Sequence, residues 1–264
     1  MATKKTATKK TAPKKAAVPA AKAAALDGVD AVLAALKAKA TKRTRDGMAR
    51  YAIPADHAWG VSLGDIRQIA KRAGQSHALA ADLWATGVYE ARMLAAFVDE
   101  PERVTVAQMD RWCRDFDSWA LCDTLCFSLF DRTPHAFDRI ARWADRDPEL
   151  VKRAAFALLA SLALHDKHSD DAPFAACLPL IERAASDERN FVKKGVSWAL
   201  RGVGRRSAAL NTAAVAVARR LAASSEPAPR WVGKDALREL TSAAVAKRLA
   251  KKRSAGAVTS RPAR

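Results

Sequence analysis

The chain has 264 residues, of which half are apolar and only 6% aromatic, and it carries a formal net charge of +18. Alanine dominates the apolar residues and, with Leu, Lys and Arg, favours helix, whereas a strand-rich fold needs more Val, Ile, Thr and Tyr. No apolar run reaches the length of a membrane span and the N-terminus lacks the apolar core of a secretory signal, so we expect a cytoplasmic protein without membrane contact.

The two ends of the chain carry most of the positive charge. Residues 1–24 contain seven Lys, residues 247–264 contain seven Lys or Arg, and neither segment contains an acidic residue. Such segments lack the apolar mass that offsets the entropy of ordering, so we expect disordered basic tails at 1–26 and 247–264. Tails without acidic residues are suited to binding a polyanion such as DNA, because each phosphate that they neutralise releases counterions and so favours binding. The alternative is that they only keep the protein soluble.

Between the tails, apolar residues recur at helical spacing. Asp147 before Pro148 is typical of an N-cap followed by proline at the first helical position, and Thr133–Pro134 and Asp187–Glu188 read in the same way. The predicted helices, in chain order, are 29–40, 62–73, 78–86, 88–98, 105–115, 118–130, 134–145, 148–164, 173–185, 188–204, 207–223 and 232–250.

Beyond residue 105 these helices group into four antiparallel pairs, at 105–130, 134–164, 173–204 and 207–250. The spacing of about 35 to 40 residues is typical of HEAT-like helical repeats, whose pairs stack into a curved solenoid with a concave binding face. We therefore predict one all-α domain over residues 27–246.

The cysteines and histidines do not indicate a metal site. The four Cys form neither a disulfide framework nor paired C-x-x-C motifs, and Cys122 and Cys126, one helical turn apart, are expected to be buried thiols in a reducing compartment. His165 and His168 lie beside the acidic loop 166–171, which reads as a surface loop. We expect no metal and no cofactor.

Trp119 and Asp123 are the first candidate functional residues. A separation of four places an indole and a carboxylate on one face of a helix, which is an unusual pair for a core. The alternative is a core tryptophan beside a surface carboxylate.

Two basic segments follow. Lys152 and Arg153 stand near the start of a predicted helix, where they also read as an exposed basic pair. Further along, a helical stripe of three cations around one tryptophan fits a surface that follows phosphates and offers an aromatic platform, although a solvated basic face is the alternative. The stripe consists of Lys194, Trp198, Arg201 and Arg205.

Four segments, in this order, resemble the AlkD-type DNA alkylation repair glycosylases, which are HEAT-like repeat proteins. They are Met48–Tyr51, the pair Trp119/Asp123, Lys152–Ala155 and Phe191–Arg201. The resemblance, from about Gly47 to Leu240, implies a solenoid whose concave face holds duplex DNA. It implies Asp123 as the catalytic carboxylate, Trp119 and Trp198 as an aromatic wall, Arg153 as a DNA contact and Tyr51 as a further residue lining the site. Ser118 departs from the family, because some relatives carry a second Trp there.

The implied activity is hydrolysis of the N-glycosidic bond of cationic N3- or N7-alkylated purines in duplex DNA, by a cytoplasmic, nucleoid-associated monomer. The resemblance also implies that excision can proceed while the base remains stacked. A non-catalytic helical-repeat protein that binds distorted or branched DNA, or compacts it, is the main alternative. A protein-binding scaffold is a third possibility that the basic tails disfavour.

Overall fold

The computed structural model describes residues 25–259 of the chain, with side chains to residue 252. Every regular element in this range is helical, which confirms the all-α prediction. The first helices are α1 (Gly28–Ala38), α2 (Lys42–Met48), the 3₁₀ helix η1 (Ala49–Tyr51), α3 (Leu63–Ala73), α4 (His77–Ala85), α5 (Tyr89–Val98), η2 (Pro101–Arg103), α6 (Val106–Arg114), α7 (Trp119–Ser128) and η3 (Phe130–Arg132). The others are α8 (Ala136–Trp143), α9 (Glu149–His165), α10 (Ala172–Ala176), α11 (Leu178–Ala184), α12 (Asn190–Gly204), α13 (Ala208–Ala222), α14 (Pro227–Leu240) and α15 (Ala243–Thr259). None of these described helices is long and apolar enough to cross a membrane.

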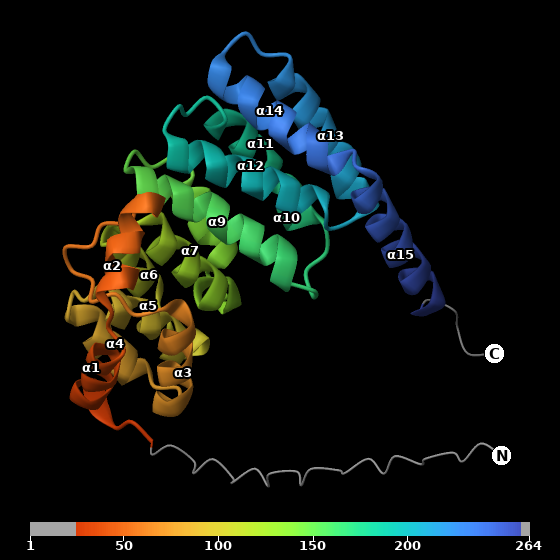
Figure 1. The fold of residues 1–264 in the computed structure, drawn as a ribbon. Coiled ribbons are helices and arrows are strands. Elements are labelled where there is room, and N and C mark those ends of the chain that lie inside the picture. Colours follow the sequence, from red (N-terminus) through yellow and green to blue (C-terminus); the bar gives the residue numbers. More distant parts are fainter. Residues whose placement is uncertain (1–24, 260–264) are drawn as a thin grey trace, which may run out of the picture.

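The helices follow a curved path from α1 and α3 through α9 and α12 to α13 and α14 (Figure 1). From α6 onward they are arranged in two rows. Helices α7, α9, α12 and α14 pack one against the next, and we call them the inner row. Helices α8, α11 and α13 pack on α9, α12 and α14 respectively, and with α6 they form the outer row. This arrangement confirms the predicted solenoid of helical pairs.

Several boundaries differ from the prediction. Helix α2 was not predicted, because its sequence, KRTRDGM, carries a glycine and almost no apolar periodicity. The segment predicted as one helix at 173–185 is divided at Cys177 into α10 and α11. The segment predicted as one helix at 232–250 belongs to two helices: α14, which starts earlier, at Pro227, and ends at Leu240, and α15, which starts at Ala243.

Among the predicted helices, the starts agree with the structure to within one residue where a hydroxyl residue caps the helix. Ser118 accepts a hydrogen bond from the backbone N–H of Leu121 at 3.3 Å, and this bond fixes the first turn of α7. The predicted cap at Asp147 is wrong, because α9 begins at Glu149 with Pro148 as its N-cap. The predicted starts at Thr133 and Asp187 are wrong in the same way, since α8 and α12 begin two to three residues later.

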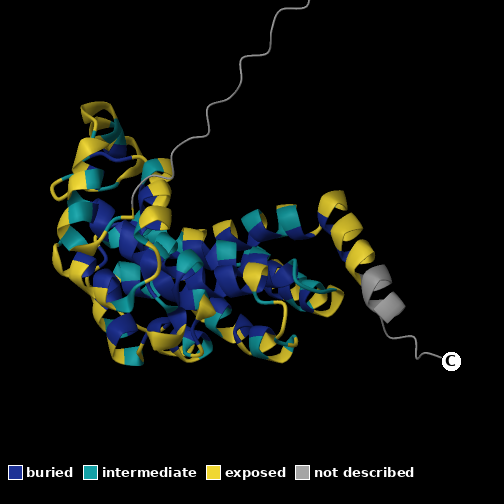
Figure 2. Ribbon diagram, turned by 90° about the horizontal axis from the view of Figure 1, so that it is seen from below, coloured by how far each residue is buried: buried dark blue, intermediate teal, exposed yellow. Residues whose placement is uncertain are grey.

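One core of buried residues runs through the stack from α1 to α14, and Figure 2 shows the buried residues in the interior of the molecule. All four cysteines are free and buried, which confirms the prediction for Cys122 and Cys126. The thiol of Cys122 donates to the backbone carbonyl of Leu150 at 3.7 Å and that of Cys126 donates to the carbonyl of Ala154 at 3.6 Å, so these two cysteines join α7 to α9. Gly233 allows α13 and α14 to pack closely, because a Cβ there would lie 2.2 Å from the backbone nitrogen of Ala222.

The C-terminal basic segment differs from the disordered tail predicted at 247–264, because residues 247–259 belong to α15, which projects from the stack (Figures 1 and 2). Lys252 Nζ donates to the carbonyls of Arg205 at 3.3 Å and Arg206 at 2.8 Å, at the end of α12. Residues 260–264 and the predicted arm, apart from its last two residues, lie outside the described residues.

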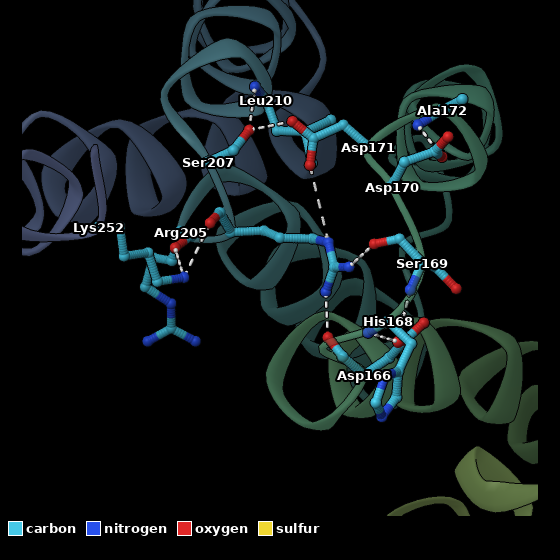
Figure 3. A network of polar contacts seen from close by, with 11 residues as sticks. Asp166, His168, Ser169, Asp170, Asp171, Ala172, Arg205, Ser207, Leu210 and Lys252 are labelled. Atoms are coloured by element: carbon cyan, nitrogen blue, oxygen red, sulfur yellow. Dashed lines mark hydrogen bonds and ion pairs between the residues drawn. The ribbon is translucent and has the colours of Figure 1, made fainter. Parts of the chain in front are cut away.

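The acidic loop 166–171 is used structurally (Figure 3). The Asp166 carboxylate accepts from the backbone N–H groups of His168 and Ser169, and the side chain of Asp171 hydrogen-bonds that of Ser207. The Arg206 guanidinium donates to the carbonyls of Asp166 and Ser169, so the loop is attached to the end of α12.

Candidate active site

Asp123 and Arg153 form a two-pronged ion pair across the inner row, between α7 and α9. Arg153 Nε donates to Asp123 Oδ1 at 2.9 Å and Arg153 Nη2 donates to Oδ2 at 2.7 Å, while Nη1 donates to the carbonyl of Phe191 at 2.8 Å. The side chains are only 17% and 7% exposed. Three helices, α7, α9 and α12, therefore hold one carboxylate in a fixed orientation.

The environment of Asp123 changes its acidity. Burial raises the pKa of the carboxyl above its ordinary value of 3.8, although the charge and the hydrogen bonds of Arg153 oppose the shift. Protonation of Asp123 would remove the acceptor of one of its two hydrogen bonds with Arg153. The ion pair therefore favours the charged carboxylate, whereas burial, which keeps water away from it, favours the neutral acid.

Trp119 is attached to a part of the chain far away in sequence. Its indole Nε1 donates to the carbonyl oxygen of Tyr51 at 2.7 Å, and the Arg153 guanidinium lies over its ring at 5.9 Å. Tyr51 ends η1, and Ala52 turns the chain with a left-handed backbone at φ 53°, an uncommon conformation for a residue with a Cβ. The side chain of Tyr51 itself is 65% exposed.

These residues line a pocket of about 470 Å³ at the N-terminal ends of α9 and α12, which we call the Trp119 pocket. Its lining includes Tyr51, Trp119, Arg153, Asn190, Phe191 and Lys194.

A second pocket of about 390 Å³, the Trp198 pocket, lies further along the inner row. Phe127 stacks on Trp198 with ring centroids 4.8 Å apart and planes 9° apart, so α7 supports the ring from α12. Arg153 and Lys194 border both pockets. The lining of the Trp198 pocket consists of Asp123, Arg153, Lys194, Trp198, Arg201, Arg205 and Trp231.

The stripe predicted on α12 thus lines one pocket, but its charges are partly neutralised. Arg201 and Arg205 approach Glu239 of α14 at 2.7 and 2.8 Å, and Arg201 also lies 3.6 Å from Asp235. Lys194 forms no ion pair among residues 25–252, and it is exposed. Of the three cations in the stripe, Lys194 is the one with its charge available to a ligand.

Lys152 is not brought to the site. Its ammonium lies 3.2 Å from Asp187, between α11 and α12, and it lines neither pocket. The Trp119 and Trp198 pockets adjoin at Arg153 and Lys194, and we call them together the inner-row groove. Because Lys152 and Arg153 are consecutive on a helix, their side chains point about 100° apart, so only one of the two can face this groove.

Four site residues were not predicted individually: Phe127, Asn190, Phe191 and Trp231. Phe127 follows Asp123 by four positions, so the helical face that predicted the Trp119/Asp123 pair also contained it. Trp231 lay just outside the predicted helix at 232–250, and the Pro227-Ala-Pro229 segment was the signal for an earlier start. No pattern indicated that the carbonyls of Tyr51 and Phe191 would accept side-chain hydrogen bonds.

The arrangement offers an oriented carboxylate in the lining of the Trp198 pocket, an indole in each of the two pockets, and an available cation, Lys194, that borders both. Such a set can stabilise positive charge that develops on a bound molecule and can contact phosphate. Among the described residues, no group of three or more His, Cys, Asp or Glu side chains is placed to hold a metal ion.

Comparison with known proteins bears on the fold and on the family of the chain. None of the curated proteins compared matches the chain. A solved structure of a protein described as belonging to "a new family of proteins related to the HEAT-like repeat DNA glycosylases with affinity for branched DNA structures" matches with a TM-score of 0.68 and 20% identity, covering 81% of this chain and 96% of that one. The family model described as DNA alkylation repair enzyme matches residues 32–240, which include both pockets. The chain belongs to the DNA alkylation repair enzyme family.

Proposed function

We propose that the protein is a DNA glycosylase that hydrolyses the N-glycosidic bond of cationic N3- or N7-alkylated purines in duplex DNA. The observation that carries the proposal is the Asp123 carboxylate, which lines the Trp198 pocket and is held through both oxygens by Arg153, a residue that lines both pockets. Asp123 is the catalytic carboxylate in this account, and Arg153 orients it.

The chemistry follows from where charge develops. Cleavage of an N-glycosidic bond leaves the deoxyribose with oxocarbenium character, and a fixed carboxylate beside the sugar stabilises that charge. Each Asp123 oxygen accepts one hydrogen bond from Arg153 and retains a lone pair, which can face the sugar or align the attacking water. The indole rings of Trp119 and Trp198 add cation–π attraction to the same positively charged sugar.

The leaving base needs no acid catalyst. A purine alkylated at N3 or N7 already carries a positive charge and leaves as a neutral base, so one carboxylate suffices and a second one is not required. This requirement restricts the substrates to cationic lesions, which we expect to be cleaved without a metal or another cofactor.

Duplex DNA is the expected partner, bound along the inner row by a monomer. Lys194 supplies an available cation beside both pockets, and Arg201 and Arg205 can exchange part of their contact with Glu239 for phosphate. Tyr51, with its exposed ring, lies at the edge of the same groove. The excess of positive charge in the tails adds attraction to DNA that is independent of sequence and favours association with the nucleoid.

DNA binding without excision is the second candidate. Both Asp123 oxygens already accept from Arg153, and the structural relative is described as having affinity for branched DNA. In this second account the ion pair with Arg153 is the whole role of the carboxylate, which is then a structural anchor, and the groove serves only to bind DNA.

One assay separates the two candidates. The protein is incubated in EDTA with a duplex containing 7-methylguanine and, in parallel, with the unmodified duplex, and free base is measured by chromatography. Release of 7-methylguanine from the modified duplex alone supports the glycosylase. Tight binding of both duplexes without release would establish the binding protein instead.

A further inference from the structure

A third pocket, of about 350 Å³, lies among α6, α8 and the start of α9, and it shares no lining residue with the Trp119 and Trp198 pockets. We call it the Arg139 pocket. Four arginines line it against a single carboxylate, that of Asp110; the arginines are Arg114, Arg139, Arg142 and Arg146. This surface belongs mainly to the outer row and has no part in the site described above.

The inner wall of the Arg139 pocket is rigid. Asp110 accepts from Arg139 Nη1 at 2.7 Å and from the indole Nε1 of Trp143 at 2.8 Å, and Arg139 also pairs with Asp138. The side chain of Arg139 is only 6% exposed, and its buried Nε has no hydrogen-bond partner. A buried guanidinium and a tryptophan are therefore locked in place by one aspartate.

The rim of the pocket has uncompensated positive charge. Arg114 and Arg146 are exposed and form no ion pair among residues 25–252, and the nearest Arg142 contact with a carboxylate is 3.7 Å, to Asp138. Guanidinium groups around a small concave surface attract an anion, and their planar donor forks match phosphate oxygens two at a time.

The first turn of α9 adds to this field. Val151 lines the pocket, and the N-terminus of a 17-residue helix carries partial positive charge. The one carboxylate of that turn, on Glu149, accepts from the backbone N–H of Phe191 at 3.2 Å and so is directed toward α12.

We propose that the Arg139 pocket binds a backbone phosphate of a second DNA segment, separate from the duplex held along the inner row. The separation follows from helix geometry. Val151 lines the Arg139 pocket and Arg153 lines the other two pockets. These residues are two positions apart on α9, so their side chains point about 200° apart, to opposite faces of the helix. One straight duplex seated over Asp123 does not reach the opposite face of α9. A second arm or a displaced strand does.

The inference rests on the proposed function in taking DNA as the source of the phosphate and in seating one duplex along the inner row. The test compares a three-way DNA junction with the linear duplex that forms one of its arms, by fluorescence anisotropy over a salt series. The variant is Arg114→Gln/Arg146→Gln, which removes two exposed cations and leaves the buried Arg139 intact. The matched control is Arg103→Gln/Arg219→Gln, two exposed cations that line none of the three pockets.

We expect the Arg114/Arg146 variant to bind the junction at least about tenfold more weakly, with a log–log salt slope lower by about one to two, and to bind the linear duplex like the wild type. The control variant changes both affinities equally and little. Equal weakening on junction and duplex would overturn the claim of a second segment. Unchanged binding of both would show that the pocket does not contact DNA.

Two further measurements identify the source of the phosphate and separate the two proposals. Calorimetric titration with inorganic phosphate gives weak or no binding if the pocket recognises DNA, whereas tight binding that the variant loses, with junction affinity unchanged, would assign the pocket to free phosphate and overturn the proposal. Release of 7-methylguanine by the wild-type protein tests the glycosylase independently, so its failure leaves the junction result standing.

Discussion

Phe127 lies face to face with Trp198, the two rings 4.8 Å apart and nearly parallel, so that a residue of α7 sets the position of an indole on α12. Phe127 also forms a T-shaped pair with His165, with ring centroids 5.5 Å apart and planes 81° apart. The aromatic wall of the Trp198 pocket is therefore placed by the same helix that carries Asp123.

Replacing Phe127 by Ala removes this support without touching Asp123. We expect a loss of about 1–3 kcal/mol in the free energy of unfolding, from lost apolar burial and ring stacking, and a roughly tenfold slower excision. Phe127→Leu should restore most of the stability but not the rate, because it fills the space without stacking. Chemical denaturation and single-turnover excision measure the two effects, and a rate restored by Leu would contradict the positioning role.

The rate of excision should depend on pH through Asp123. Its pKa is raised from 3.8, chiefly by burial, and catalysis requires the ionised form. Activity is therefore present above the raised pKa and is lost as the pH falls through it, at a higher pH than for an ordinary aspartate. Single-turnover rates corrected for spontaneous depurination give the profile. A rate that stays flat down to the ordinary aspartate range would argue against an ionised Asp123 in the mechanism.

Arg153→Ala leaves the carboxylate of Asp123 buried and without its partner. We expect the free energy of unfolding to fall by about 3–5 kcal/mol, as is usual when one member of a buried pair is removed. Asp123→Ala/Arg153→Ala should cost less than the two single changes added together, because it leaves neither charge unpaired. Urea denaturation of the four proteins tests this coupling, and strictly additive losses would show that the ion pair contributes nothing.

Residues 1–24 and the end of α15 are expected to bind phosphate and not to take part in the chemistry. Deletion of 1–24 and 253–264 should reduce the slope of log affinity against log salt concentration by several units, at about 0.9 for each cation that contacts DNA. The deletion keeps Lys252, which attaches α15 to the end of α12. Replacing the seven lysines of residues 1–24 by Gln provides a control of unchanged length.

Binding should weaken equally on damaged and undamaged duplexes, since phosphate contacts carry no base information. The excision rate at saturating protein should remain, because both pockets lie between residues 49 and 231. An unchanged salt slope would show that the tails do not contact DNA. A lost single-turnover rate in a folded variant would instead place a tail in the catalytic complex.

Helical periodicity predicted most of the fold because long helices leave a clear pattern in the sequence, continuous and apolar in the buried α9 and amphipathic in α12. The stripe from Lys194 to Arg205 was placed correctly on one face for the same reason. Short polar α2 carries no such pattern, and it was missed. Prolines misled the helix starts, because Pro148 occupies the N-cap and not the first helical position.

Spacing alone linked site residues only where they share a helix, whereas the family resemblance added Tyr51, Arg153 and Trp198, which line the two pockets. Trp119 and Asp123 were linked by their spacing, but the contact of Trp119 with Tyr51 joins residues 68 positions apart through a backbone carbonyl, which has no sequence signature. The neutralisation of Arg201 by Glu239 likewise depends on how α12 packs on α14. Such contacts are set by tertiary packing and not by local pattern.

The catalytic role of Asp123 is tested most directly by Asp123→Asn in a single-turnover assay of 7-methylguanine release, with excess protein over duplex. Asparagine keeps the shape and one acceptor for Arg153 but removes the negative charge. Asp145→Asn, an exposed aspartate paired with Arg183, serves as the matched control. We predict that Asp123→Asn still folds and binds the duplex but releases base about 10²–10³ times more slowly, while the control matches the wild type. Near-normal release by Asp123→Asn would contradict the account.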